Sequence, residues 1–189
     1  MFGFLLFVTS IIYGIIQPAH QSTYPRNVTY AAHLMGYNQK FEQPPWPVPG
    51  NQFIIPRWIH KDGLAFTNAV HYRHGRLTVS ADGLYFVYSH VSFTESSSSR
   101  DDNTDSNSLS HYLYRYNIMY PNGGEEMLLM NSFNTCSANN EQAEYSSYLG
   151  ALFKLRNGDE LFVKVSNLTL LVTNSKINTF GYFKIGDST

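Results

Sequence analysis

The segment that most restricts the fold is residues 83–93, GLYFVYSHVSF, which has no charged side chain and four aromatic ones. The turn-like sequence Ala-Asp-Gly at 81–83 precedes it, and its composition predicts a long β-strand. Successive side chains of a strand point to opposite faces, so both faces carry large groups. One face holds Tyr85, Val87, Ser89, Val91 and Phe93, and the other holds Leu84, Phe86, Tyr88, His90 and Ser92. Either the second face meets another subunit, or the strand is central and covered within one monomer.

Composition narrows the class of protein. The 189 residues suit one domain with a short leader. Only 14% of the residues are charged and the net charge is −1, which disfavours a nucleic-acid-binding protein. Cys136 is the single cysteine, so an intrachain disulfide and a cysteine-based metal cluster are excluded and this thiol is expected to be unpaired.

The N-terminus differs from the rest of the chain. Residues 1–16 are uncharged and apolar, yet shorter than the ~20 residues that a membrane-spanning helix needs. We interpret them as a signal peptide or the remnant of a signal anchor, with a buried core element as the alternative. Residues 17–27 are predicted to be a short stalk or linker, and residues 28–189 the folded domain. Two sequons, at Asn27 and Asn167, are candidate glycosylation sites.

From residue 28 onward, short β-compatible runs alternate with turn sequences, which predicts an all-β sandwich or barrel. The proline-rich segment 37–52 and the polar segments 95–108 and 137–145 are predicted to be loops. The predicted strands are residues 28–35, 53–59, 64–72, 76–80, 83–93, 109–120, 125–136, 146–155, 160–172 and 179–185.

Motifs of catalysis and of cofactor binding are missing from the sequence. It has no glycine-rich phosphate loop, no G-x-S-x-G, no H-E-x-x-H and no C-x-x-C. The alternative of a Ca²⁺ site formed by Asp101, Asp102 and Asp105 is disfavoured, because the loop that carries them has no rigid frame. We therefore predict a binding module that is not an enzyme and that has no cofactor and no metal.

Four segments together resemble a known family: IPRWIHKDGLAF, RLTVSADGLYFVYSHVSF, SSYLGALFKLRNGDELFVKVSNLTLL and TFGYFKI. In this combination they are similar to the homology domain of the tumour necrosis factor superfamily, from about Val28 to Ile185. The resemblance implies a jelly-roll sandwich of about ten antiparallel strands that forms a homotrimer. It also implies a cytokine that binds and clusters cysteine-rich receptors in immune response or apoptosis. The alternative is a C1q-like trimeric recognition module for extracellular ligands, although collagen-like repeats are missing from this chain.

The resemblance also implies roles for particular residues. The second face of the 83–93 strand would meet neighbouring subunits, which favours the first of the two readings given above. Protonation of three His90 side chains near a threefold axis would weaken the trimer between pH 7 and 5. The implied trimer interface consists of Phe86, Tyr88, His90, Tyr148, Gly150, Leu152, Phe183 and Ile185.

Receptor contact is implied first for Tyr120 with Pro121, because close relatives carry a Tyr-Pro pair in the corresponding loop. The alternative for Tyr120 is an aromatic side chain that only caps the turn. Weaker candidates are Trp46, Glu141 and Arg73. Relatives join the Cys136 position by a disulfide to the loop 95–108, which has no cysteine here. The family also implies an extracellular location, either on the cell membrane as a single-pass type II protein or secreted.

Overall fold

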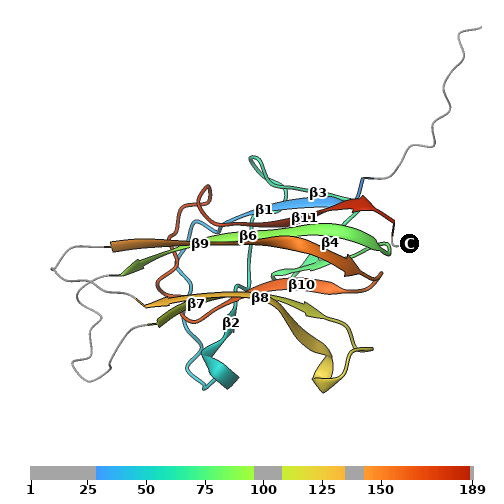
Figure 1. Cartoon of the computed structure of the whole chain (residues 1–189). Coiled ribbons are helices and arrows are strands. Elements are labelled where there is room, and N and C mark those ends of the chain that lie inside the picture. Colours follow the sequence, from blue (N-terminus) through green and yellow to red (C-terminus); the bar gives the residue numbers. More distant parts are fainter. Residues whose placement is uncertain (1–28, 96–107, 135–142, 188–189) are drawn as a thin grey trace, which may run out of the picture.

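The fold is a sandwich of two antiparallel sheets, seen in a computed structural model that describes residues 29–95, 108–134 and 143–187 (Figure 1). Sheet A has the strand order β3-β1-β11-β6-β9. Its strands are β3 (Phe66–Asn68), β1 (Ala31–Met35), β11 (Thr179–Gly186), β6 (Gly83–Glu95) and β9 (Ala143–Leu155). This arrangement confirms the predicted all-β, jelly-roll type of fold.

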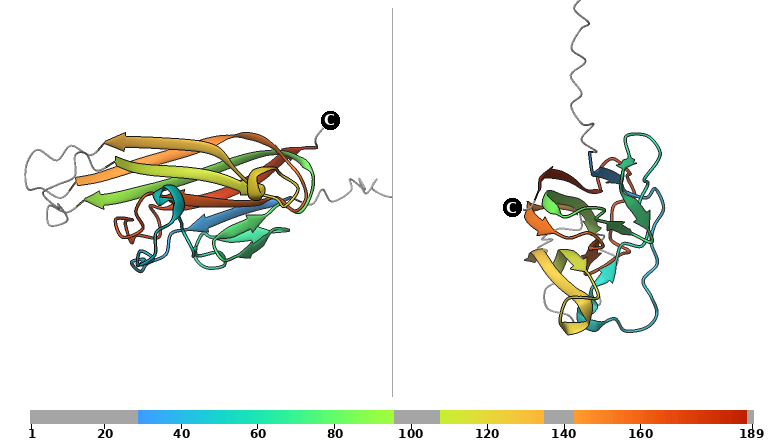
Figure 2. Two further views of the ribbon diagram at one scale, coloured as in Figure 1. Left: turned by 90° about the horizontal axis from the view of Figure 1, so that it is seen from below. Right: turned by 90° about the vertical axis from the view of Figure 1, so that its right-hand side faces the viewer.

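Sheet B has the order β4-β5-β10-β7-β8, with the short β2 paired to β10. Figure 2 shows the long strands of both sheets running along the same axis of the molecule. Short 3-10 turns lie at Pro49–Asn51 and Asn122–Gly124. The strands of this sheet are β4 (His71–Arg73), β5 (Arg76–Thr78), β10 (Glu160–Val165), β7 (Ser108–Tyr116), β8 (Glu125–Asn134) and β2 (Phe53–Ile54).

The hydrophobic core lies between the sheets and draws on the inner face of β6. Tyr85, Val87, Val91 and Phe93 are fully buried, as the alternation of the sequence predicts. On the opposite face of the same strand Ser92 is fully buried, but the four larger side chains are only half-buried, although β6 lies between β11 and β9. These four are Leu84, Phe86, Tyr88 and His90. Within the described part of the chain, the outer face of this central strand therefore remains partly open, as the interpretation of a subunit contact requires.

The predicted strand 64–72 is wrong, because the chain changes sheets in its middle. Phe66–Asn68 pairs with β1 in sheet A, and His71–Arg73 pairs with β5 in sheet B. Ala69 between them has a φ of 52°, a left-handed conformation that breaks the ladder. The run has no glycine or proline at this point, so its composition does not reveal the break.

Other predicted strands have different limits. In the segment 53–59, only Phe53–Ile54 forms a strand before Pro56, and Ile59 makes an isolated bridge to Met35. The strand predicted over 160–172 ends at Val165, and the one predicted over 109–120 runs from Ser108 to Tyr116. The predicted loop 137–145 overlaps β9, which already begins at Ala143. Helices long and apolar enough to cross a membrane do not occur among the described residues.

Candidate functional site

The outer face of sheet A carries large side chains that this subunit leaves partly uncovered. Tyr148 is 59% exposed and Leu152 53%, and Phe183 and Ile185 are exposed to a similar degree. The ring of Phe86 packs on Phe183 with their centroids 5.6 Å apart. We call this surface the aromatic face. It comprises His33, Phe66, Phe86, Tyr88, His90, Tyr148, Leu152, Phe183 and Ile185. All eight residues of the implied trimer interface lie on the three strands β6, β9 and β11.

Two residues of this face, His33 and Phe66, were missed by sequence reasoning. A hydrogen bond of 2.7 Å joins His33 Nδ1 to Tyr88 Oη, and the imidazole stacks on Phe66 with a centroid distance of 6.4 Å. Burial lowers the pKa of His33 and, together with the nearby Tyr148 phenol, raises the pKa of Tyr88 to about 12. The alternation of side chains in AAHLM places His33 and Leu34 on opposite faces of the strand. The residues that contact His33 depend on the register with the neighbouring strands, which the sequence does not show.

Two glycines let the tyrosines of the aromatic face lie flat on the sheet. A Cβ atom on Gly181 would come within 2.6 Å of Tyr88 Oη and 2.2 Å of the Ala32 carbonyl oxygen. A Cβ atom on Gly150 would come within 2.7 Å of Tyr148 Oη. Because Gly150 has no side chain, it leaves room for the Tyr148 ring on the aromatic face. This explains physically why a glycine lies among the residues of the predicted interface.

His90 is half-buried at the edge of this face and has a partner within its own subunit. Its Nδ1–H donates a hydrogen bond of 2.6 Å to the backbone carbonyl of Ile177. This bond fixes the ring against the loop before β11. The pH dependence implied for His90 stays a prediction.

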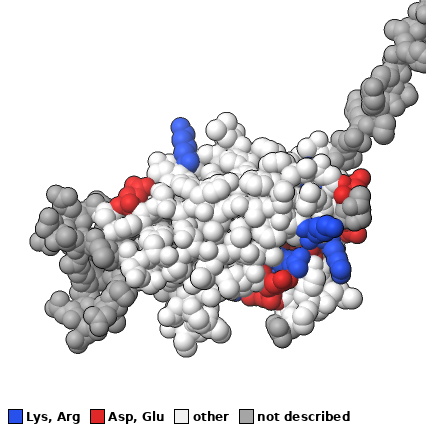
Figure 3. Space-filling model, viewed as in Figure 1, with Lys and Arg blue, Asp and Glu red and all other residues white. Residues whose placement is uncertain are grey.

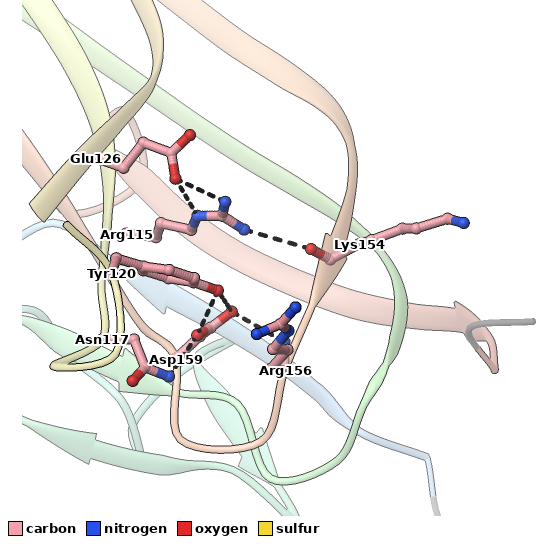
Figure 4. Close-up of polar contacts among 7 residues, drawn as sticks. All are labelled: Arg115, Asn117, Tyr120, Glu126, Lys154, Arg156 and Asp159. Carbon is pink, nitrogen blue, oxygen red and sulfur yellow. Dashed lines mark hydrogen bonds and ion pairs between the residues drawn. The ribbon is translucent and has the colours of Figure 1, made fainter. Parts of the chain in front are cut away.

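The loop 117–121 carries the implied receptor contact, and its Tyr120 is anchored by Asp159 of the β9–β10 hairpin and by Arg115 of β7 (Figure 4). Tyr120 Oη donates to both carboxylate oxygens of Asp159, at 3.0 and 3.1 Å. The Arg115 guanidinium lies over the phenol ring, with Cζ 4.4 Å from the centroid. Arg115 itself forms two hydrogen bonds to Glu126 Oε2, at 2.8 and 2.6 Å. Burial, then the hydrogen bond to Asp159, raise the pKa of Tyr120.

Asp159 is the centre of this arrangement and is fully buried in the β9–β10 hairpin. Besides Tyr120, it accepts hydrogen bonds from Asn117 Nδ2 at 2.8 Å and from the Arg156 backbone amide at 2.9 Å. Four contacts thus satisfy both carboxylate oxygens. The hydroxyl group of Tyr120 is thus used within the subunit, as the alternative of a turn-capping aromatic side chain predicts. The half-buried ring is still accessible to a partner.

The tip of the same loop exposes two aliphatic side chains that sequence reasoning missed. Ile118 is 82% exposed and Met119 is 80% exposed, directly before Tyr120 and the exposed Pro121. Large apolar side chains at a loop tip are a recognisable sequence signal for a contact surface, since the subunit itself does not bury them. Two such residues in NIMYP carry that signal here.

The remaining predicted residues lie apart from this loop or outside the described residues. Trp46 is 65% exposed in the proline-rich segment, and Arg73 is exposed at the end of β4. Asn167 is half-buried and accepts hydrogen bonds from the Thr169 amide at 2.9 Å and hydroxyl at 2.8 Å. Groups of three potential metal ligands do not occur in the described part of the chain. Outside the described residues lie Asn27, Asp101, Asp102, Asp105, Cys136 and Glu141.

Comparison with known proteins identifies the family. The model of the TNF (Tumour Necrosis Factor) family matches residues 56–185. Tumor necrosis factor ligand superfamily member 6 (Fas ligand) of Felis catus is 34% identical over 162 residues, which are 85% of this chain and 50% of that protein. Member 6 of Rattus norvegicus is 35% identical over 161 residues, again 85% of this chain and 50% of that protein.

Member 11 of the same superfamily, from Homo sapiens, is 30% identical over 141 residues, which are 75% of this chain and 44% of that protein. The chain thus spans about half the length of the curated relatives it matches. These matches favour the cytokine reading over the C1q-like alternative. The chain belongs to the tumour necrosis factor family.

Proposed function

We propose that this chain is a trimeric cytokine that binds and clusters cysteine-rich receptors of the tumour necrosis factor receptor family, in immune response or apoptosis. The observation that carries the proposal is the family match over 56–185, supported by relatives whose names describe them as ligands. Binding, and not catalysis, is then the activity of the chain. Its site of action is extracellular, at a cell surface or after release, and Asn27 and Asn167 are candidate glycan positions.

The aromatic face supports assembly into a trimer. The charged side chains on the same side of β9, those of Glu144 and Lys154, lie beyond the aromatic face toward opposite ends of the strand. On the flank of the molecule drawn in Figure 3, charged side chains gather mainly at the end that holds the β9–β10 hairpin, and the middle is uncharged. An uncharged surface rich in exposed aromatic rings is typical of an interface.

The energy available from this face is sufficient for a stable assembly. Burying a large apolar side chain completely contributes about 1.5–3 kcal/mol. Tyr148, Leu152, Phe183 and Ile185 retain roughly half of that area, so each would add on the order of 1 kcal/mol per subunit. Three subunits multiply this gain, which favours an obligate trimer in which folding and assembly are coupled.

Receptor binding is proposed for the loop 117–121, with Trp46, Arg73 and Glu141 as further candidates. Ile118 and Met119 offer apolar anchors on a loop that Asp159 holds in place. An anchored loop loses little conformational entropy on binding, which favours affinity. Three copies in one trimer would add avidity for receptors clustered on a membrane.

The test combines solution mass with receptor binding. Sedimentation equilibrium of the full chain should give three times the chain mass. Surface plasmon resonance against a panel of cysteine-rich receptor ectodomains should then identify at least one that binds. A monomer that binds no member of the panel contradicts the proposal.

A further inference from the structure

The end of the molecule that holds the loop 117–121 also has a pocket of about 340 Å³ between four segments. These are the loop 117–121, the end of β7, the end of β9 with the β9–β10 hairpin, and the turn before β6; four of the pocket residues appear in Figure 4. Three cations line it against one carboxylate. The lining residues are Asp82, Arg115, Tyr120, Lys154, Leu155 and Arg156.

The charges of the pocket are not balanced within the subunit. Arg115 is paired with Glu126 at 2.6 Å, and Asp82 Oδ1 accepts a hydrogen bond from the Asn157 amide at 2.8 Å. Lys154 and Arg156 are exposed, and neither forms an ion pair among the residues that the structure describes. Figure 4 shows the Arg156 guanidinium beside Tyr120 and Asp159, whereas the Lys154 side chain extends away from them. Arg156 is therefore a pocket cation without an ion pair among the described residues, and Lys154 is an exposed cation at the rim.

The surroundings of the pocket indicate what kind of group would enter it. Ile118 and Met119 extend from the loop that carries Tyr120, so apolar and positive groups lie on one contiguous end of the molecule. A protein segment with an acidic side chain next to apolar ones complements both. A sulfated polysaccharide would leave the aliphatic side chains unmatched, and it would find only two free cations.

We infer that this pocket receives an Asp or Glu side chain of the bound receptor, whose carboxylate pairs with Arg156, with Lys154 as a second cation at the rim, while its apolar neighbours contact Ile118 and Met119. The inference rests on the proposed receptor binding and names the chemistry of the contact. Arg115 remains paired with Glu126 and lines one side of the pocket, next to the Tyr120 ring on which it packs. Charge-assisted hydrogen bonds to a carboxylate would add specificity and speed association.

The experiment uses the full chain and the receptor ectodomain selected from the panel. Lys154→Glu and Arg156→Glu are compared with Lys176→Glu, the same charge change at an exposed residue that does not line the pocket. Each pocket variant should raise the dissociation constant at least tenfold, while Lys176→Glu changes it less than twofold. Sedimentation equilibrium of each variant separates loss of binding from loss of assembly, because Lys154 lies at the end of β9.

Charge exchange makes the test specific. Each Asp and Glu of the receptor's contact region is replaced by Lys in turn, and one of these variants should restore binding to Lys154→Glu or Arg156→Glu. Wild-type affinity in both pocket variants overturns the inference and leaves the cytokine proposal intact. The inference is also overturned if binding is weakened but no charge reversal in the receptor restores it. It is overturned as well if heparin displaces the receptor equally from the wild type and from the pocket variants. Failure of the wild-type chain to bind any ectodomain overturns both proposals.

Discussion

The burial of His111 between the two sheets predicts that the fold is less stable at acidic pH. Its ring comes from β7 in sheet B, is fully buried, and reaches hydroxyl groups of sheet A on both sides. Its Nδ1 lies 3.0 Å from Ser147 Oγ and its Nε2 lies 3.0 Å from Ser89 Oγ. Burial, and secondarily the neighbouring His90, lower the pKa of His111 to about 3. The folded subunit therefore holds this ring neutral.

The sign and size of the effect follow from the two pKa values. An unfolded histidine has a pKa near 6.5, so between about pH 6.5 and 3 the unfolded state binds a proton that the folded state does not. The stability linked to His111 is fully present above about pH 6.5 and decreases as pH falls toward 3. Each unit in that window removes ~1.4 kcal/mol, or ~2 kcal/mol in total at pH 5. That is a sizeable part of the ~5–15 kcal/mol typical of a domain.

Urea unfolding at pH 7.5 and pH 5.0 measures this loss in wild type and in His111→Gln. Glutamine can donate and accept hydrogen bonds but does not titrate in this range. Other groups, including His33, contribute in both proteins, so wild type should lose ~2 kcal/mol more than the variant. The chain concentration is held constant because assembly adds to the apparent stability.

Equal losses in the two proteins would refute this reasoning. A direct measurement guards against a variant that folds poorly. The NMR signal of the His111 ring in wild type should remain that of a neutral imidazole at pH 5. A ring that titrates near pH 6.5 in the folded protein contradicts the structural argument independently of any variant.

Three further perturbations test the aromatic face and the loop 117–121. Tyr148→Ala should dissociate or unfold the trimer in sedimentation equilibrium, whereas Trp46→Ala, at an exposed loop residue, should keep the wild-type mass; a stable Tyr148→Ala trimer contradicts the interface. His90→Asn should reduce the weakening of the trimer expected between pH 7 and 5, to which the buried His111 also contributes, and a wild-type mass that does not change over this range contradicts that prediction. Tyr120→Phe removes only the hydroxyl contacts to Asp159 and should lower the free energy of unfolding by ~1 kcal/mol. It should weaken receptor binding less than Tyr120→Ala, and equal weakening would show that the hydroxyl group carries the contact.

The alternation of side chains along a strand predicted burial more reliably than any other feature of the sequence. In β6 it separated the buried Tyr85 and Val87 from the half-buried Phe86 and Tyr88, because the period of two is a property of the strand itself. The break at Ala69 was missed because a composition that favours strand does not show where a chain leaves one sheet for the other. Such a break depends on tertiary contacts, which override local preference.

Contacts between distant segments account for what the sequence could not predict in the site. His33, Phe66 and Tyr88 come from three different strands and meet only through the registers of β1 with β3 and of β1 and β6 with β11. The bond between Tyr120 and Asp159 joins residues 39 positions apart, and the sequence shows only a Tyr-Pro pair and an Asn-Gly-Asp turn. Neither these short motifs nor the periodicity of the sequence predicts the contact between Tyr120 and Asp159.

The anchoring of Tyr120 changes how its proposed role should be understood. A tyrosine with a free hydroxyl could offer a receptor a hydrogen bond, but here the proton is donated to a fully buried carboxylate. Withdrawing it would leave each Asp159 oxygen with a single hydrogen bond, from Asn117 or from the Arg156 amide, and the loss of a donor to a buried carboxylate is costly. In the proposed role, the tyrosine would hold the loop and present its ring, while the directly exposed side chains of the loop are Ile118 and Met119. Receptor affinity should consequently depend on the rigidity of this loop as well as on its contacts.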